Sequence, residues 1–220
     1  MLLLLWPVAL LYPTPVAFGL GQVRERAQAA LADWLQGLAA VGEAQLQPLL
    51  PGMQVLCVAL GVAAPCLLGY GVMKGAGRRA LFAASALLVG TLTLALSTAL
   101  TWGPNWTWGW LRATQACGLA GGALLALAAL PLPQRVCSAL LAVALLVQLW
   151  LLNHAPANAY DLANLQQWER GRFIHFYGLA QWVGWLWPFV VLVYLLARAL
   201  ARGPKAAVQS PPEPMQKGEE

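Results

Sequence analysis

The sequence predicts an all-α protein, a polytopic bundle of about six transmembrane helices with short amphipathic helices at the membrane interface. Hydrophobic residues make up 60% of the 220 and charged residues only 10%, whereas soluble domains carry about 25% charged residues. Five or six stretches stay apolar over the length that a bilayer requires, roughly 20 residues. They lack the alternation of membrane barrel strands, and a backbone in lipid must satisfy its own hydrogen bonds, so we expect helices.

The first expected span covers residues 2–20 and contains Pro7, Pro13 and Pro15. A secretory signal peptide would look similar, but it begins with basic residues. No basic side chain occurs in residues 1–8. We therefore expect a retained span and six helices, or five if this segment is removed.

The other spans follow from continuous apolar runs of suitable length. They are expected at Met53–Met73, Ala80–Thr101, Ala113–Leu130, Val136–Leu152 and about Phe173–Leu200. Residues 1–202 would thus form one transmembrane domain.

Two segments are too polar to cross the membrane. Residues 21–51 place apolar side chains at helical spacing opposite charged ones, which predicts a helix lying on the membrane surface. A helix in a soluble loop is the alternative. Residues 203–220, rich in Pro, Gln, Lys and Glu, predict a disordered cytoplasmic tail.

The distribution of basic residues predicts the orientation, because Lys and Arg are retained on the cytoplasmic side. With both termini inside, eight basic residues fall on the inner side, and five on the outer side are matched by five acids. The inner side then carries the whole net charge of +5. The eight inner residues are Lys74, Arg78, Arg79, Arg135, Arg198, Arg202, Lys205 and Lys217.

Small residues predict close helix packing. Gly118 and Gly122 form a GxxxG motif, and this spacing lets helix backbones approach closely. We expect contacts within the chain rather than a dimer interface. A second stripe with the same spacing comprises Cys57, Gly61, Pro65 and Gly69. The four cysteines show no metal or redox spacing and are expected to be small buried thiols; they are Cys57, Cys66, Cys117 and Cys137.

The polar and aromatic residues within or beside the spans limit the classes of function that the chain can have. No charged residue lies at the centre of a span, which disfavours a coupled transporter, and nucleotide-binding and nucleophile-elbow motifs are missing. We expect membrane lipids as partners, and no cofactor or nucleic acid. Trp102, Trp106, Trp108 and Trp110 gather at the predicted outer interface. They are typical of interfacial anchors, and a stacking platform for a sugar or an isoprenoid head is the alternative.

The richest polar segment, residues 153–189, holds both histidines of the chain and lies on the predicted outer side. His154, Glu169 and His175 are acid/base candidates if the protein is an enzyme. Solvation and headgroup contact are the ordinary explanation for these side chains. Two histidines with one nearby carboxylate give no recognised metal spacing. The binding candidates are Tyr160, Trp168, Arg170, Arg172, Gln181 and Trp182, of which the two arginines would grip a phosphate.

Several spaced residues of this segment resemble the C-terminal half of long bacterial VanZ-like membrane proteins. They are Asn153, Pro156, Asn158 and Tyr160, then Gln166, Trp168, Gly171 and Phe173, then Phe176, Gly178, Leu179, Leu186, Trp187, Pro188 and Phe189. Residues 10–21, LLYPTPVAFGLG, are similar to the start of that half. The family's defining domain usually lies upstream, so the chain would be a stand-alone or truncated relative.

The resemblance implies a multi-helix protein of the bacterial inner membrane and brings no established catalytic residues. The family is named for its association with low-level teicoplanin resistance. We therefore expect a non-catalytic accessory role in the cell envelope that affects glycopeptide susceptibility or the assembly of surface glycans. The alternative is a membrane-interface enzyme acting on a lipid-linked or glycan substrate.

Overall fold

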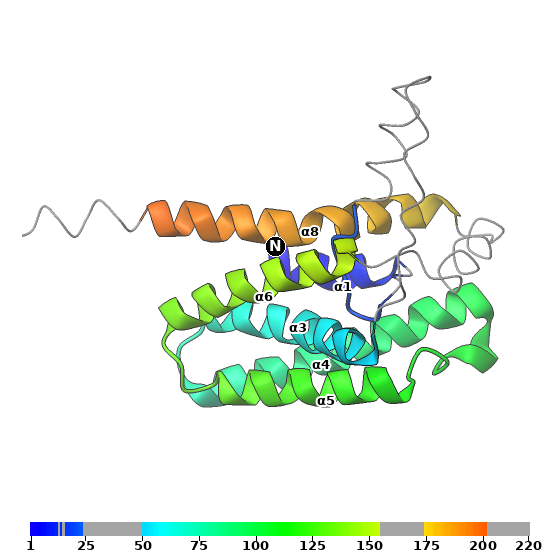
Figure 1. Ribbon diagram of the computed structural model, residues 1–220, viewed down its shortest axis with the longest axis horizontal. Helices are drawn as coiled ribbons and strands as arrows, with labels where there is room; N and C mark the ends of the chain where they lie inside the picture. Colours follow the sequence, from blue (N-terminus) through cyan, green and yellow to red (C-terminus); the bar gives the residue numbers. More distant parts are fainter. Residues whose placement is uncertain (13, 15, 24–49, 155–173, 202–220) are drawn as a thin grey trace, which may run out of the picture.

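Helices account for most of the described chain in the computed structural model, which describes residues 1–12, 14, 16–23, 50–154 and 174–201. In chain order they are α1 (Leu2–Leu10), α3 (Pro51–Tyr70), α4 (Ala76–Trp102), the short 3-10 helix η1 (Pro104–Trp106), α5 (Ala113–Ala128), α6 (Gln134–His154) and α8 (Ile174–Leu200). No strand occurs within these residues. The long helices run along the long axis of the molecule as a bundle (Figure 1).

Within the described residues, four helices are long and apolar enough to cross a membrane: α3, α4, α6 and α8. The sequence-based boundaries of these spans and of α5 are confirmed to within a few residues. Helix α5 is apolar but has only 16 residues, about 24 Å at 1.5 Å per residue. An all-helical bundle with several potential spans is thus confirmed, and six crossings stay a prediction.

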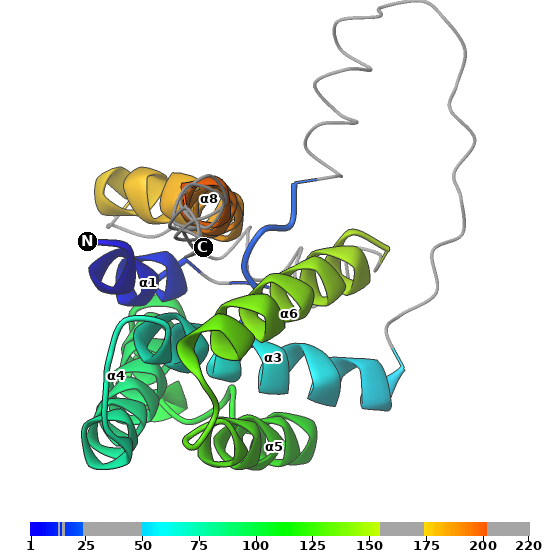
Figure 2. The same ribbon diagram turned by 90° about the vertical axis from the view of Figure 1, so that its left-hand side faces the viewer.

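Helix α3 lies among α4, α5 and α6 (Figure 2). Added Cβ atoms at Gly118 and Gly122 of α5 would lie 2.5 and 2.7 Å from the Cβ atoms of Val58 and Val62 of α3, respectively. The two backbones meet this closely only because glycine has no side chain. The prediction that the GxxxG motif packs within the chain is confirmed.

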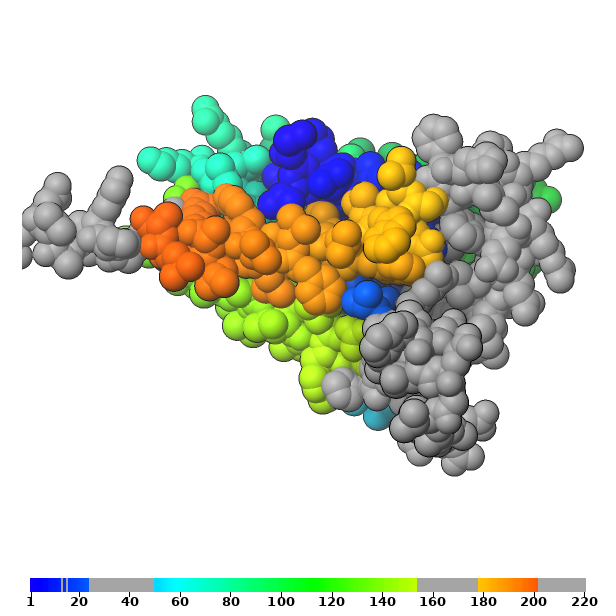
Figure 3. All heavy atoms as spheres, turned by 90° about the horizontal axis from the view of Figure 1, so that it is seen from above, coloured from blue at the N-terminus to red at the C-terminus, as the bar shows by residue number. Residues whose placement is uncertain are grey.

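The helix expected over residues 2–20 ends at Leu10, which corrects the first predicted span. Nine helical residues extend only about 13 Å, well short of a bilayer core of about 30 Å. The described residues that follow, up to Val23, have irregular backbone yet are largely buried, and Phe18 has a positive φ of 62°. The apolar run thus continues as buried irregular backbone rather than as the predicted helix. Helix α1 itself lies beside α8 (Figure 3).

The bundle has two distinct ends. The basic end contains residues 71–75, residues 129–135 and the last turn of α8. The aromatic end contains residues 102–112, the end of α6 and the start of α8. The amphipathic helix expected over residues 21–51 falls almost wholly outside the described residues, as does the tail expected over residues 203–220.

Candidate functional site

Arg79 is a charged side chain that is only 6% exposed and makes four hydrogen bonds to backbone carbonyls. Its Nη1 atom donates to the carbonyl oxygens of Leu130 and Leu132 at 2.8 and 2.7 Å. Its Nη2 atom donates to Tyr70 O at 3.1 Å and its Nε atom to Met73 O at 3.2 Å. Tyr70 ends α3, and the other three carbonyls lie in the turns just beyond the C-terminal ends of α3 and α5, where helix dipoles favour a cation. Arg79 therefore holds the turn between α3 and α4 against the turn between α5 and α6.

The irregular segment after α1 is held by neutral donors and acceptors from α4 and α6. Ser97 Oγ donates to Leu11 O at 2.7 Å, and the buried Gln148 Nε2 donates to Phe18 O at 2.9 Å. Asn153 accepts a hydrogen bond from the backbone N–H of Val23 at 3.2 Å. Irregular backbone is tolerated at membrane depth where protein groups satisfy it. The polar side chains of Ser97 and Gln148 thus fix this segment.

The ring of Phe18 anchors the same segment in an aromatic contact. It stacks on Trp6 with centroids 6.1 Å apart and meets Trp110 edge-on at 6.3 Å. An added Cβ at Gly90 of α4 would lie 2.6 Å from Trp6 and 2.8 Å from Phe18. Trp110 therefore packs into the bundle in addition to lying near the predicted interface.

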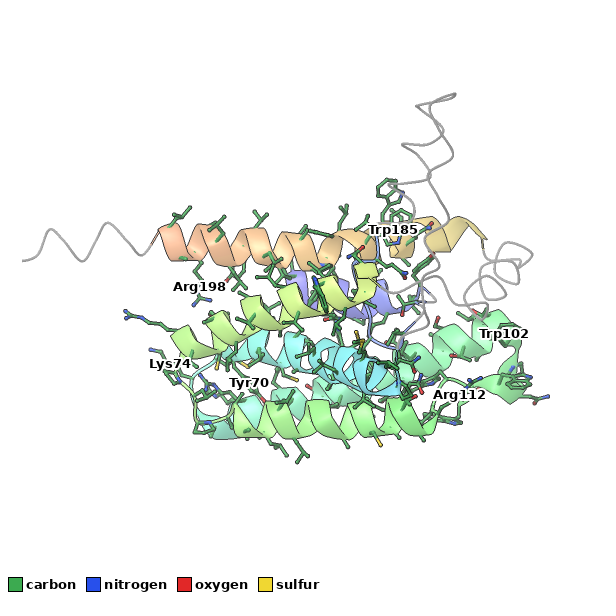
Figure 4. All side chains as sticks on the ribbon, in the orientation of Figure 1. Tyr70, Lys74, Trp102, Arg112, Trp185 and Arg198 are labelled. Carbon is green, nitrogen blue, oxygen red and sulfur yellow. The ribbon has the colours of Figure 1, made fainter. Side chains whose placement is uncertain are left out.

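A second aromatic cluster lies at the outer surface of α8. The rings of Trp182 and Trp185 meet edge-on at 5.5 Å, and Trp185 meets Tyr12 edge-on at 6.4 Å. Gln181 Nε2 donates to Tyr12 Oη at 3.4 Å. Trp182 is 60% exposed, and Figure 4 shows Trp185 on the upper side of α8, near the aromatic end. We call these four residues the aromatic platform: Tyr12, Gln181, Trp182 and Trp185.

The aromatic platform contains two of the predicted binding residues, Gln181 and Trp182. Sequence reasoning missed Tyr12 and Trp185 as site residues. The helical spacing of Trp182 and Trp185 was a usable signal, because residues three apart share a helix face. Nothing in the sequence indicates that Tyr12, about 170 positions away, meets them.

The predicted catalytic candidates are only partly located. His154 is the last residue of α6 and His175 the second residue of α8, both toward the aromatic end. Their side chains are outside the described part of the structure. Glu169, Tyr160, Trp168, Arg170 and Arg172 all lie in residues 155–173, which are not described.

The thiols and the metal-binding potential can be judged only for the described residues. Cys57, Cys66 and Cys137 are buried and free, as predicted, whereas Cys117 is exposed on α5 and corrects that part of the prediction. No group of three metal-ligating side chains occurs within the described ranges. Among the described residues, the candidate site is therefore the aromatic platform with its hydrogen-bonding groups.

Comparison with protein-family models, curated proteins and solved structures finds no match for this chain. The functional argument therefore depends on the residues themselves.

Proposed function

We propose that this protein is an integral inner-membrane protein of the bacterial cell envelope with a non-catalytic accessory role. Its aromatic platform would bind the sugar of a surface glycan or of a lipid-linked glycan precursor. The observation that carries the proposal is the exposed ring of Trp182, braced by Trp185 and the Gln181–Tyr12 hydrogen bond.

The chemistry of the platform suits a ligand at the membrane surface. An indole offers an apolar face and an N–H donor, a combination favoured where one side of a ligand is apolar and the other wet. A sugar ring presents C–H groups to such a face and hydroxyl groups to neighbouring amides such as Gln181. Two edge-on contacts limit the side-chain motion that binding would otherwise have to arrest.

The buried polar groups support an accessory role over a catalytic one. The described side chains that are both buried and polar or charged are Arg79, Ser97 and Gln148. Each donates to backbone carbonyls of the chain itself, so their described contacts are structural. The resemblance to VanZ-like proteins favours an envelope role linked to glycopeptide susceptibility, and the basic residues favour a cytoplasmic location for the basic end.

A pair of substitutions on one face of α8 tests the proposal. Trp182→Ala should weaken binding of a fluorescent lipid-linked glycan to the full chain in lipid nanodiscs severalfold, corresponding to about 0.5–1.5 kcal/mol for an aromatic contact. Leu179→Ala removes a side chain that is 72% exposed one turn away and should leave binding unchanged. Equal affinities of the two variants would contradict the proposal.

Measurements in cells that express the protein distinguish an accessory role from an enzyme at the aromatic end. His175→Ala and Glu169→Ala should give graded changes in glycopeptide susceptibility while the protein accumulates normally. A general acid or base contributes roughly 10²–10⁴-fold to rate. Complete loss of the phenotype in either variant, with normal accumulation, would establish the enzymatic alternative.

A further inference from the structure

Three exposed cations lie at the basic end: Lys74, Arg78 and Arg135. Lys74 lies in the turn between α3 and α4, Arg78 in the first turn of α4 and Arg135 in the first turn of α6. Figure 4 shows Lys74 at the end of the bundle opposite to Trp102 and Arg112. Within the described residues, these three side chains make no hydrogen bond or ion pair.

The nearby backbone carbonyls already have other donors. Besides Arg79, Gln134 Nε2 donates to Val72 O at 3.2 Å, and Arg198 Nη2 donates to Gly71 O at 2.9 Å. The carbonyls at and just beyond the end of α3 are thereby occupied by side chains of α4, α6 and α8. The three exposed cations are left to face outward.

Charge balance at the basic end points to an anionic partner. All eight Asp and Glu residues of the chain lie outside the described ranges, so no carboxylate accompanies these cations within the described structure. The described basic residues at this end also include Arg79 and Arg198. Such a concentration of one sign of charge attracts counter-ions and anionic headgroups.

Each cation also has an exposed apolar neighbour in the sequence. Val72, Leu81 and Val136 are all exposed and lie one to three residues from Lys74, Arg78 and Arg135, respectively. The occupant must therefore offer an anionic group beside an apolar body. A phospholipid has this construction, and a soluble phosphate does not.

We propose that the basic end binds the phosphate headgroups of anionic phospholipids through Lys74, Arg78 and Arg135, with the acyl chains against Val72, Leu81 and Val136. This site is independent of the aromatic platform and of the envelope function proposed above. Arg79 and Arg198 hold the turns in place while the three exposed cations contact the lipid.

The full chain in phosphatidylcholine bilayers provides the test, with spin-labelled phosphatidylglycerol and phosphatidylcholine as probes. The wild-type protein should associate with phosphatidylglycerol more strongly than with phosphatidylcholine. Lys74→Gln, Arg78→Gln and Arg135→Gln should each lower this ratio, by up to about fivefold. Arg112→Gln makes the same charge change at the other end and should leave the ratio unchanged, as should the charge-keeping Arg78→Lys.

Three outcomes would overturn the proposal. One is a wild-type ratio near unity, and another is an equal loss in Arg112→Gln and Arg78→Gln. The third is displacement of the labelled lipid by glycerol phosphate at matched ionic strength, which would indicate a site for soluble phosphate. If a glutamine variant fails to accumulate, a salt titration of the wild type decides, because the Debye length falls from about 10 Å at 0.1 M salt to about 3 Å at 1 M. The preference for phosphatidylglycerol should decrease as the salt concentration rises. A ratio that does not depend on salt would contradict charge-based binding.

Discussion

The basic end and the interior segment after α1 face the same physical problem and meet it differently. Both contain backbone carbonyls that no helix satisfies, in a protein whose long helices are suited to lipid. At the basic end the donors are the charged side chains Arg79 and Arg198. In the interior, the donors to the carbonyls of Leu11 and Phe18 are the neutral side chains Ser97 and Gln148.

Depth explains the difference. A charged group is costly near the centre of a bilayer but affordable near its surface. Arg79 lies in the first turn of α4, whereas Ser97 and Gln148 lie more than one turn before the C-terminal ends of α4 and α6, respectively. An arginine can therefore satisfy four carbonyls at one end of the bundle, while the deeper segment depends on single hydrogen bonds from uncharged groups.

Removing the charged clamp should have the largest effect. Arg79→Ala leaves the carbonyls of Tyr70, Met73, Leu130 and Leu132 without this donor. Hydrogen bonds to charged groups contribute about 1.5–3 kcal/mol each, so we expect a loss of at least about 3 kcal/mol. Thermal unfolding in detergent measures it.

The neighbouring Arg78 provides the control for this clamp. Arg78→Ala removes an exposed cation from the same helical turn and should change stability by no more than about 0.5 kcal/mol. Similar unfolding temperatures of the Arg79→Ala and Arg78→Ala variants would show that the Arg79 contacts do not stabilise the turns.

Displacing the interior segment should have a smaller but clear effect. An added Cβ at Gly61 of α3 would lie 2.3 Å from Phe18 O, so Gly61→Ala must push the segment away. Overpacking of this kind costs about 1–3 kcal/mol. At Gly178 of α8 a Cβ would meet nothing within 4 Å, and Gly178→Ala should stabilise the helix by up to about 1 kcal/mol. Unfolding midpoints that move in the same direction would disprove the docking of Phe18.

The contact between α1 and α8 should be the least sensitive of the three. A Cβ at Gly184 would lie 3.3 Å from Ala9 O, so Gly184→Leu should lower the yield of assembled protein. Val193→Leu, at an exposed position on the same helix, should be tolerated. Equal yields would mean that α8 does not pack on α1 through its N-terminal half.

The spans after residue 50 were predictable because their signal is length and continuous hydropathy, which the bilayer itself imposes. Residues 11–23 were not, because an apolar residue reports burial and says little about backbone conformation. Pro13 and Pro15 in this segment, with Gly19 and Gly21 close behind, were the available signals, since proline lacks an N–H donor and glycine adopts unusual dihedral angles.

The two ends differed in how far their residues could be predicted. The sequence placed Arg79 among the basic residues of the inner side but gave no sign that it is the only buried cation of the described residues, because two of its four partners, Leu130 and Leu132, lie about 50 residues away. Gln181 and Trp182 were predicted as binding residues, and the Tyr12 contact depends on long-range folding. Residues 155–173, which hold the other candidates, stay a prediction.

The orientation of the two ends in the membrane is the most direct test of the account, because the proposed role of the aromatic platform depends on it. A reporter that is active only in the cytoplasm should be active when fused after Arg79, after Arg135 or at the C-terminus. It should be silent when fused near Asn105 or Asn164. The reverse pattern would place the aromatic platform in the cytoplasm and contradict both the orientation inferred from charge and a role for that platform at the outer surface.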